Sequence, residues 1–326
     1  MNNPLVFLGD VNFQTVPKVE DKLAKYLSDK VVVANFEGYL SETTDPSTLG
    51  ITMENFLHMV KVLNIKYLNI ANNHVFDGGL ECFKHTIKAL HNLEIEFFGL
   101  KEKPFIIVEI GGLKFGILSF AWRMTGTKNK ALNICILRLS KIKKQIKELK
   151  KTVDYIIIYP HWGIDMETLP HPWQILAAQQ LLKLGADLII GHHPHMIQPF
   201  QGKVFYSIGN TYLPENEVTR YQKKTANAGL IVVPKINGKN IEIEFKGVKF
   251  SNEQIYLDDN PNVKLLEYSG DYVKFFKRYR AKKMIPIFTG KVQDYFFALP
   301  YLLLLEKIVH LKPIMKLLRK RRKRNK

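Results

Sequence analysis

The sequence has few cysteines and lacks an apolar run of the roughly 20 residues that a membrane-spanning helix needs. Two cysteines among 326 residues, Cys82 and Cys135, cannot build a disulfide framework, and they indicate reduced thiols in a reducing compartment. The N-terminal segment MNNPLVFLGD has no basic n-region, and its apolar run stops at Gly9-Asp10. That run is too short for a signal peptide or an anchor, so we expect a cytoplasmic body.

Positive charge is concentrated at the C-terminal end of the chain. The formal net charge is +18, and half of it comes from residues 312–326, which hold nine Lys or Arg and no acidic residue. Before this tail, Tyr295–Leu305 is an uncharged, aromatic-rich stretch broken by Pro300. Such a stretch beside a basic tail is typical of a segment that binds an anionic membrane surface, and it predicts a peripheral location on the inner face of the cell membrane. Nucleic acid is the competing partner.

The rest of the sequence alternates between short β-rich runs and helical patterns. Two glycine-containing turns, Gly111-Gly112 and Asn237-Gly238, predict hairpins, and residues 140–151 and 172–185 predict helices. This order indicates an α/β protein with a mixed sheet, or two packed sheets, and helices outside. We expect one domain over residues 1–255 and a basic, aromatic-rich helical extension over 256–326. Six apolar runs each predict a buried strand of about four to six residues that then breaks into polar residues, and they lie at 5–10, 31–37, 66–74, 154–163, 187–195 and 203–210.

Each of these six runs ends in polar residues of the kind that bind metals. Ligands of α/β proteins bind beyond the carboxyl ends of the strands, so we expect these side chains to converge in one pocket. Carboxylates, an amide and imidazoles without a thiolate favour Mn, Fe or Zn. The number of these candidate ligands exceeds what one tetrahedral ion needs. The sequence therefore predicts two divalent transition metals. The residues concerned are Asp10, Glu37, Asn73, His74, His161, His193, His195 and Asn210.

Six motifs in order along residues 4–250 resemble those of the bacterial capsule-synthesis CapA family. That family is similar to the calcineurin-type metallophosphoesterases. The resemblance implies a four-layer αββα sandwich of the metallophosphoesterase type, a two-metal site, and a role in making poly-γ-glutamate or capsule polysaccharide. The motifs are GD (9–10), NFEG (35–38), NNHVFDGG (72–79), HWGIDME (161–167), GHHPH (191–195) and YSIGN (206–210).

The resemblance also implies a role for each matching residue. His74 would be the histidine that protonates the leaving oxygen without binding metal, and Asp77 would orient its ring. Glu37 would be the carboxylate that bridges the two metals. The remaining implied ligands are Asp10 and His195 for the first metal, and Asn73, His161 and His193 for the second.

The sequence departs from the phosphoesterase pattern where the first metal would bind. Asn12 stands where an Asp-x-His opening would have its histidine, and Asn-Asn-His replaces Gly-Asn-His-Asp. Alternation along an extended segment places His193 and His195 on one side and His192 on the other. The residues alone give no role to Glu167, and Asn210 is equally consistent with a simple turn after a strand.

Three functions fit these features. The first is a two-metal phosphoesterase acting on a phosphorylated or polyanionic substrate in capsule or cell-envelope polymer synthesis. The second is a non-catalytic metal-binding component of a membrane-associated polymer synthesis machine. The third is a nuclease or nucleotide phosphodiesterase recruited through the basic tail.

Overall fold

The computed structural model describes residues 4–122, 125, 134–216, 219, 226–238, 240–251 and 253–288. The chain divides into two compact units, Met1–Glu267 and Tyr268–Lys326. The second unit contains helix α6 (Tyr272–Phe288), while the stretch Tyr295–Leu305 and the tail 312–326 lie outside the described residues. None of the described helices is both long and apolar enough to cross a membrane.

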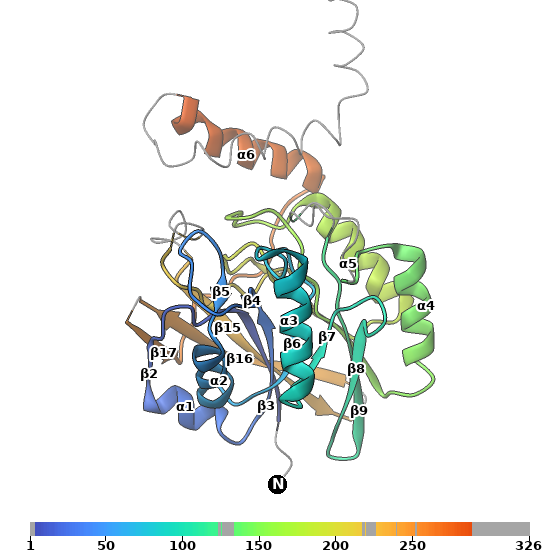
Figure 1. The fold of residues 1–326 in the computed structure, drawn as a ribbon. Coiled ribbons are helices and arrows are strands. Elements are labelled where there is room, and N and C mark those ends of the chain that lie inside the picture. Colours follow the sequence, from blue (N-terminus) through green and yellow to red (C-terminus); the bar gives the residue numbers. More distant parts are fainter. Residues whose placement is uncertain are drawn as a thin grey trace, which may run out of the picture. The chain divides into compact units, whose positions relative to one another are not determined.

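In the described part of the first unit, the larger sheet has nine strands and the smaller one has six, with a short β4–β5 pair beside them. The described helices of this unit alternate with the strands (Figure 1). They are α1 (Asp21–Leu27), α2 (Met53–Val62), α3 (Gly79–Asn92), α4 (Leu139–Leu149) and α5 (Pro172–Leu184). The order of the larger sheet is β2 (Lys18–Val19), β17 (Gln254–Asp258), β16 (Asn240–Phe250), β15 (Ala228–Asn237), β1 (Leu5–Val11), β3 (Val31–Phe36), β6 (Ile65–Asn69) and β7 (Glu96–Phe98), and β14 (Asn210–Tyr212) also pairs with β1. The order of the smaller sheet is β12 (Phe200–Gln201), β13 (Val204–Phe205), β11 (Leu188–Ile190), β10 (Tyr155–Ile158), β9 (Leu113–Leu118) and β8 (Phe105–Ile110), and the short pair is β4 (Tyr39–Leu40) with β5 (Gly50–Ile51).

Alternation along the central strands produces a layered core. In β1, Val6 and Leu8 belong to the core that also contains the buried residues of α1, α2 and α3. Phe7, on the opposite face of β1, belongs to a second core with Ile157 of β10 and Ile190 of β11, so the two sheets pack face to face. Helix α4 lies against the smaller sheet, where its Leu149 approaches Gly116 of β9. The predicted αββα sandwich is confirmed.

Local signals in the sequence explain several element boundaries. Helix α5 begins with a capping box at His171 and Pro172, and it ends at Gly185, whose φ of 106° is left-handed. The β8–β9 hairpin turns at Gly111 and Gly112, which both have positive φ. The predicted helices at 140–151 and 172–185 and both predicted hairpins are therefore confirmed within a few residues.

One predicted strand is wrong, whereas β6, β10 and β11 are short apolar strands followed by polar residues, as expected. Residues 203–210 form two short strands in different sheets, β13 and β14, because the chain crosses between the sheets at Gly209 (φ 72°). Strand β6 ends at Asn69 and β11 at Ile190, so the polar residues that follow them lie in loops. The expected domain boundary after residue 255 falls inside β17, which is paired with β16.

Candidate metal centre

Both sheets contribute polar side chains to one buried cluster. From the larger sheet, Asp10 lies near the end of β1 and Glu37 directly follows β3. From the smaller sheet, His161 follows β10, and His193 and His195 follow β11. All five are at most 5% exposed. The strands β1, β3, β10 and β11 run parallel to their neighbours β3, β6, β9 and β13, so their carboxyl ends deliver these residues together.

Asp10 lies at the centre of the cluster and is well supplied with hydrogen bonds. Its Oδ1 accepts a hydrogen bond from Asn35 Nδ2 at 2.6 Å, and its Oδ2 accepts one from the backbone N–H of His193 at 3.1 Å. The Nδ1 of His195 lies 3.3 Å from Oδ2. Burial alone would raise the pKa of Asp10, but the hydrogen bond with His195 and the nearby charges of His192 and His195 hold that pKa below its usual value. Asp10 is therefore a stable anion.

Glu37 differs from Asp10 both in its hydrogen bonding and in the direction of its pKa shift. Both of its carboxylate oxygens are buried, and neither has a hydrogen-bond partner among the described residues. Three imidazole nitrogens surround Oε1: the Nε2 atoms of His74 at 3.7 Å and of His161 and His195 at 3.8 Å. Burial and the negative charge of Asp10 raise the pKa of Glu37 to about 8. A buried carboxylate without partners, ringed by imidazoles, has the donor chemistry of a cation site.

Three donor groups in the described part of the chain could each hold a cation. In each group the ligand atoms lie within 4.8 Å of one another, and every residue is buried. Nδ1 of His193 is a further buried nitrogen without a hydrogen-bond partner among these residues. The donor set therefore fits divalent transition metals. The groups are Asp10 with His161 and His192, Glu37 with His161 and His193, and Asp10 with Glu37 and His195.

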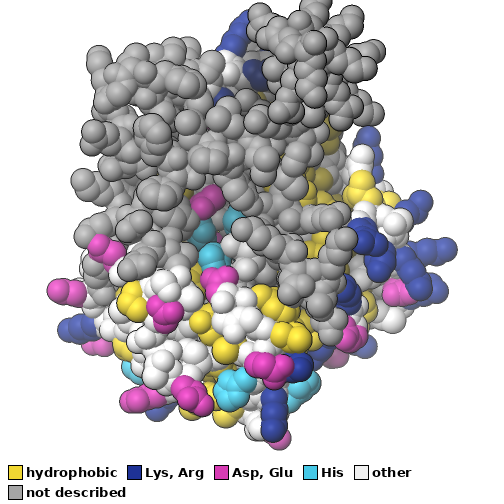
Figure 2. Space-filling model, turned by 45° about the horizontal axis from the view of Figure 1, so that its top comes forward, with side chains coloured by type: hydrophobic (Ala, Val, Ile, Leu, Met, Phe, Trp, Pro, Cys, Tyr) yellow, Lys and Arg dark blue, Asp and Glu magenta, His cyan; other side chains and the backbone are white. Residues whose placement is uncertain are grey.

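His74, Asn73 and Asp77 lie on the loop after β6. Nδ1 of His74 is 2.6 Å from Asp77 Oδ2, so the ring N–H donates to the carboxylate and Nε2 faces Glu37. Burial lowers the pKa of His74, but the hydrogen bond with Asp77 and the negative charges of Asp77 and Glu37 together outweigh burial, and the pKa is raised overall. Oδ1 of Asn73 lies 2.6 Å from His161 Nε2. The structure thus brings every sequence-predicted site residue into this cluster, and histidine and acidic side chains are visible together near the middle of the face in Figure 2.

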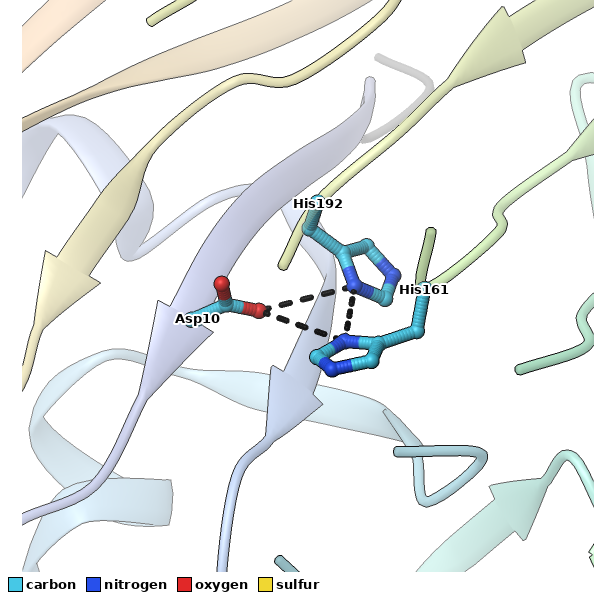
Figure 3. Close-up of side chains that lie close together, drawn as sticks. All are labelled: Asp10, His161 and His192. Atoms are coloured by element: carbon cyan, nitrogen blue, oxygen red, sulfur yellow. Dashed lines mark hydrogen bonds and ion pairs between the residues drawn. The ribbon is translucent and has the colours of Figure 1, made fainter. Parts of the chain in front are cut away.

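The prediction that His192 points away from the site is wrong. Its Nδ1 lies 2.8 Å from Nδ1 of His161 and 3.5 Å from Oδ1 of Asp10, as Figure 3 shows. The alternation rule fails here because the GHHPH segment is not a strand. His193 has a φ of 97° and His195 a φ of 58°, and such left-handed residues reverse the expected direction of the side chains.

The structure gives a position to three further residues whose roles the sequence left open: Asn210, Asp165 and Glu167. Asn210 accepts a hydrogen bond from His195 Nδ1 at 2.8 Å while its amide donates to the carbonyl of Ala226, which fixes the orientation of the imidazole. Asp165 Oδ1 lies 4.0 Å from His195 Nε2. Glu167 is buried, and its carboxylate accepts from the backbone N–H of Thr168. Alternation could not have identified Asp165, because residues 162–168 form turns and loops rather than a strand.

Asn12 occupies the place of the missing histidine and braces the loop around the site. Its amide donates to the carbonyl oxygens of Glu37 at 3.0 Å and Leu49 at 2.9 Å, and its Oδ1 accepts from the backbone N–H of Gln14. With all of these bonds made, the Asn12 side chain holds the backbone beneath Glu37.

The αββα sandwich is a fold of the metallophosphoesterase type, and it carries a buried cluster of carboxylates, an amide and imidazoles at the strand ends. The family model of the bacterial capsule synthesis protein PGA_cap matches residues 6–215. The chain belongs to this family.

Relatives agree with this assignment, and a solved structure shares the fold. The chain is 32% identical over 174 residues to the capsule biosynthesis protein CapA of Bacillus anthracis, covering 48% of this chain and 42% of that protein. It is 28% identical over 267 residues to the PGA biosynthesis protein CapA of Bacillus subtilis, covering 71% and 70%. A Staphylococcus aureus structure described as a 5′-nucleotidase shares the fold, with a TM-score of 0.50 and 14% identity, over 87% of this chain and 59% of that one.

Proposed function

We propose that the protein is a two-metal hydrolase of phosphate esters that acts in the synthesis of capsule poly-γ-glutamate or capsule polysaccharide. Membership of the capsule synthesis family supports the biological role. The observation that carries the chemistry is Glu37, a buried carboxylate without hydrogen-bond partners among the described residues that faces three imidazole nitrogens. A carboxylate in this position is best satisfied by cations on either side of it.

The two metals would share Glu37. Asp10 and His195 would complete the first site, and Asn73, His161 and His193 the second, with manganese, iron or zinc as the ion. Two such cations, when bound, neutralise charge that develops on phosphate oxygens and activate the attacking water.

His74 is our candidate for the general acid. Its Nδ1–H is held by Asp77, so its Nε2 faces the cluster, and the raised pKa favours the protonated ring that a general acid requires. In that state Nε2 donates its proton to the leaving oxygen, and Asp77 stabilises the imidazolium before the transfer. The pair would act only on a substrate whose leaving oxygen reaches Nε2.

Elemental analysis combined with turnover tests this proposal. The purified protein, loaded with manganese or zinc and freed of excess metal, should retain two equivalents and hydrolyse an aryl phosphate or an aryl phosphodiester. Glu37→Ala should lose both metal and activity, whereas the exposed control Glu102→Gln should keep both. Absence of metal in the replete wild-type protein would refute the site.

The second candidate is a metal-binding component without catalytic activity, and Asn12 is the observation that favours it. The side chain of Asn12 is committed to backbone groups, so the first site has three side-chain donors from Asp10, Glu37 and His195. A site with fewer donors binds its cation less tightly. Two bound equivalents without turnover of either substrate would favour this candidate over the hydrolase.

We further propose two partners, a polyanionic envelope-polymer substrate and an anionic membrane surface reached through the C-terminal tail. The nine basic residues of 312–326 are the support for the second partner, since each Lys or Arg near an anionic leaflet contributes about 1 kcal/mol. Retention on DNA at the same ionic strength would point to nucleic acid instead.

A further inference from the structure

The two nitrogens of His161 face different parts of the cluster. Nε2 lies 2.6 Å from Asn73 Oδ1 and 3.8 Å from Glu37 Oε1. Nδ1 lies 2.8 Å from Nδ1 of His192 (Figure 3). A neutral imidazole has one N–H and one lone pair, so His161 can offer a lone pair to a cation on one of these sides only.

Hydrogen bonding decides which side of His161 binds the cation. On the Nδ1 side, Asp10 Oδ1 already accepts a hydrogen bond from Asn35 at 2.6 Å. On the Nε2 side, neither oxygen of Glu37 has a hydrogen-bond partner among the described residues. The unmet demand for a cation is therefore at Glu37, and His161 meets it through Nε2.

This choice determines the role of His192. Once Nε2 of His161 binds a cation, the ring proton must lie on Nδ1, where Nδ1 of His192 is the nearest acceptor. We propose that His192 is a positioning residue that accepts this hydrogen bond and thereby orients His161, and that it does not bind a metal. The inference rests on the proposed function, because it concerns the second metal of that site.

The alternative is a cation held by Asp10, His161 and His192 through their mutual contacts. The separation of 2.8 Å between the two imidazole nitrogens suits an N–H···N hydrogen bond. The 2.6 Å contact between His161 Nε2 and Asn73 Oδ1 is also of hydrogen-bond length, so the hydrogen bonding of the two carboxylates decides between the two sides: Asp10 Oδ1 has a partner, and the Glu37 oxygens have none among the described residues.

The surroundings of His192 hold its ring in place for this role. Its backbone N–H donates to the carbonyl of Pro160, and its carbonyl accepts from the backbone N–H of Trp162. The backbone of His192 is therefore hydrogen-bonded to the two residues that flank His161. The ring packs edge-on against Tyr159, with centroids 4.5 Å apart. The amide nitrogen of Asn69 lies 3.4 Å from Nε2, beyond the usual hydrogen-bond range, so it does not fix the tautomer.

The test compares zinc binding by the full-length wild type and three variants. His192→Ala removes the acceptor, His192→Asn restores an acceptor oxygen near the position of Nδ1, and His193→Ala removes a proposed ligand. We expect His192→Ala to keep two equivalents at saturating zinc but to bind one of them, the cation that His161 contacts, about 10- to 100-fold less tightly than wild type in a chelator competition. His192→Asn should recover most of that loss, and His193→Ala should lose one equivalent. Thermal melts identify any variant that is not folded.

Nitrogen-15 spectra of histidine-labelled, zinc-loaded wild type give a second readout that needs no variant. We expect zinc on Nε2 of His161, a proton on its Nδ1, and an unprotonated, zinc-free Nδ1 on His192. Zinc on His192, loss of an equivalent in His192→Ala, or unchanged affinity in that variant would each overturn the inference while leaving the two-metal function intact. A wild type that binds no zinc would overturn both.

Discussion

Glu37→Gln should make the cation-free protein more stable at pH 8, although it removes a central residue of the site. The carboxylate is fully buried and has no hydrogen-bond partner among the described residues. Its ionised form is therefore poorly solvated in the folded protein, and glutamine has the shape of the protonated form without the charge. Sites built for binding often carry such a penalty in stability.

The pKa of Glu37 sets the size and sign of the effect. The rise from the ordinary 4.5 to about 8 corresponds to about 5 kcal/mol in the free energy of unfolding, at 1.36 kcal/mol for each tenfold change in proton affinity. The folded protein keeps a proton that the unfolded chain releases, so this contribution is complete below pH 4.5 and is lost as the pH rises through 8. We expect a gain of about 1–3 kcal/mol in the variant, since Glu37 also attracts His195 and His74.

Urea unfolding of chelator-treated protein at pH 5 and pH 8 measures the gain, with Glu102→Gln as an exposed control. The difference between variant and wild type is the informative quantity, because burial lowers the pKa of His161 and His193. Those histidines reduce stability as the pH falls, which is the opposite trend. A variant no more stable than wild type at pH 8, or a gap of equal size at both pH values, would refute the reasoning.

Three further outcomes are expected. His74→Ala should keep its metal content but lose about 10²- to 10⁴-fold in turnover, and Asp77→Asn should lose less; metal loss in His74→Ala would make it a ligand. Deleting residues 312–326 should weaken co-sedimentation with anionic vesicles, and the binding that remains should depend less on salt. A full-length protein that binds no vesicles would contradict this expectation. Gly209→Ala should lower the free energy of unfolding by about 2–4 kcal/mol, because its Cβ would meet the Ala228 carbonyl, whereas Gly202→Ala, also at positive φ but with open space, should lower it by about 1 kcal/mol.

The sequence predicts the layered fold and most of the site because both depend on short-range patterns. The apolar runs that become β1, β3, β10 and β11 are continuous, as expected for strands buried on both faces. Asp10, Glu37 and His161 stand at or just beyond the ends of such runs, and parallel strands bring their carboxyl ends to one edge. Local pattern and global arrangement therefore agree for these residues.

The position of the His192 side chain could not be predicted, because it depends on a positive φ at His193, which is rare for any residue other than glycine. The positive φ of His193 turns the chain out of the extended geometry that the alternation rule assumes. The hydrogen bond between Asn210 and His195 could not be predicted either, since it requires the chain to leave the smaller sheet after β13 and to join the larger sheet as β14. Each depends on contacts between segments that are set only by the packing of the two sheets.

The cluster joins the two sheets through polar groups, and this arrangement links folding to cation binding. Asp10 and Glu37 come from the larger sheet, while His161, His193 and His195 come from the smaller one. Without a cation, the sheets bring a buried carboxylate and several imidazoles together with few compensating hydrogen bonds at Glu37. A cation bound there contacts donors from both sheets, so it stabilises their packing by mass action. The feature that weakens the cation-free fold is thus the same one that makes the site selective for a cation, and Glu37→Gln should lose both effects together.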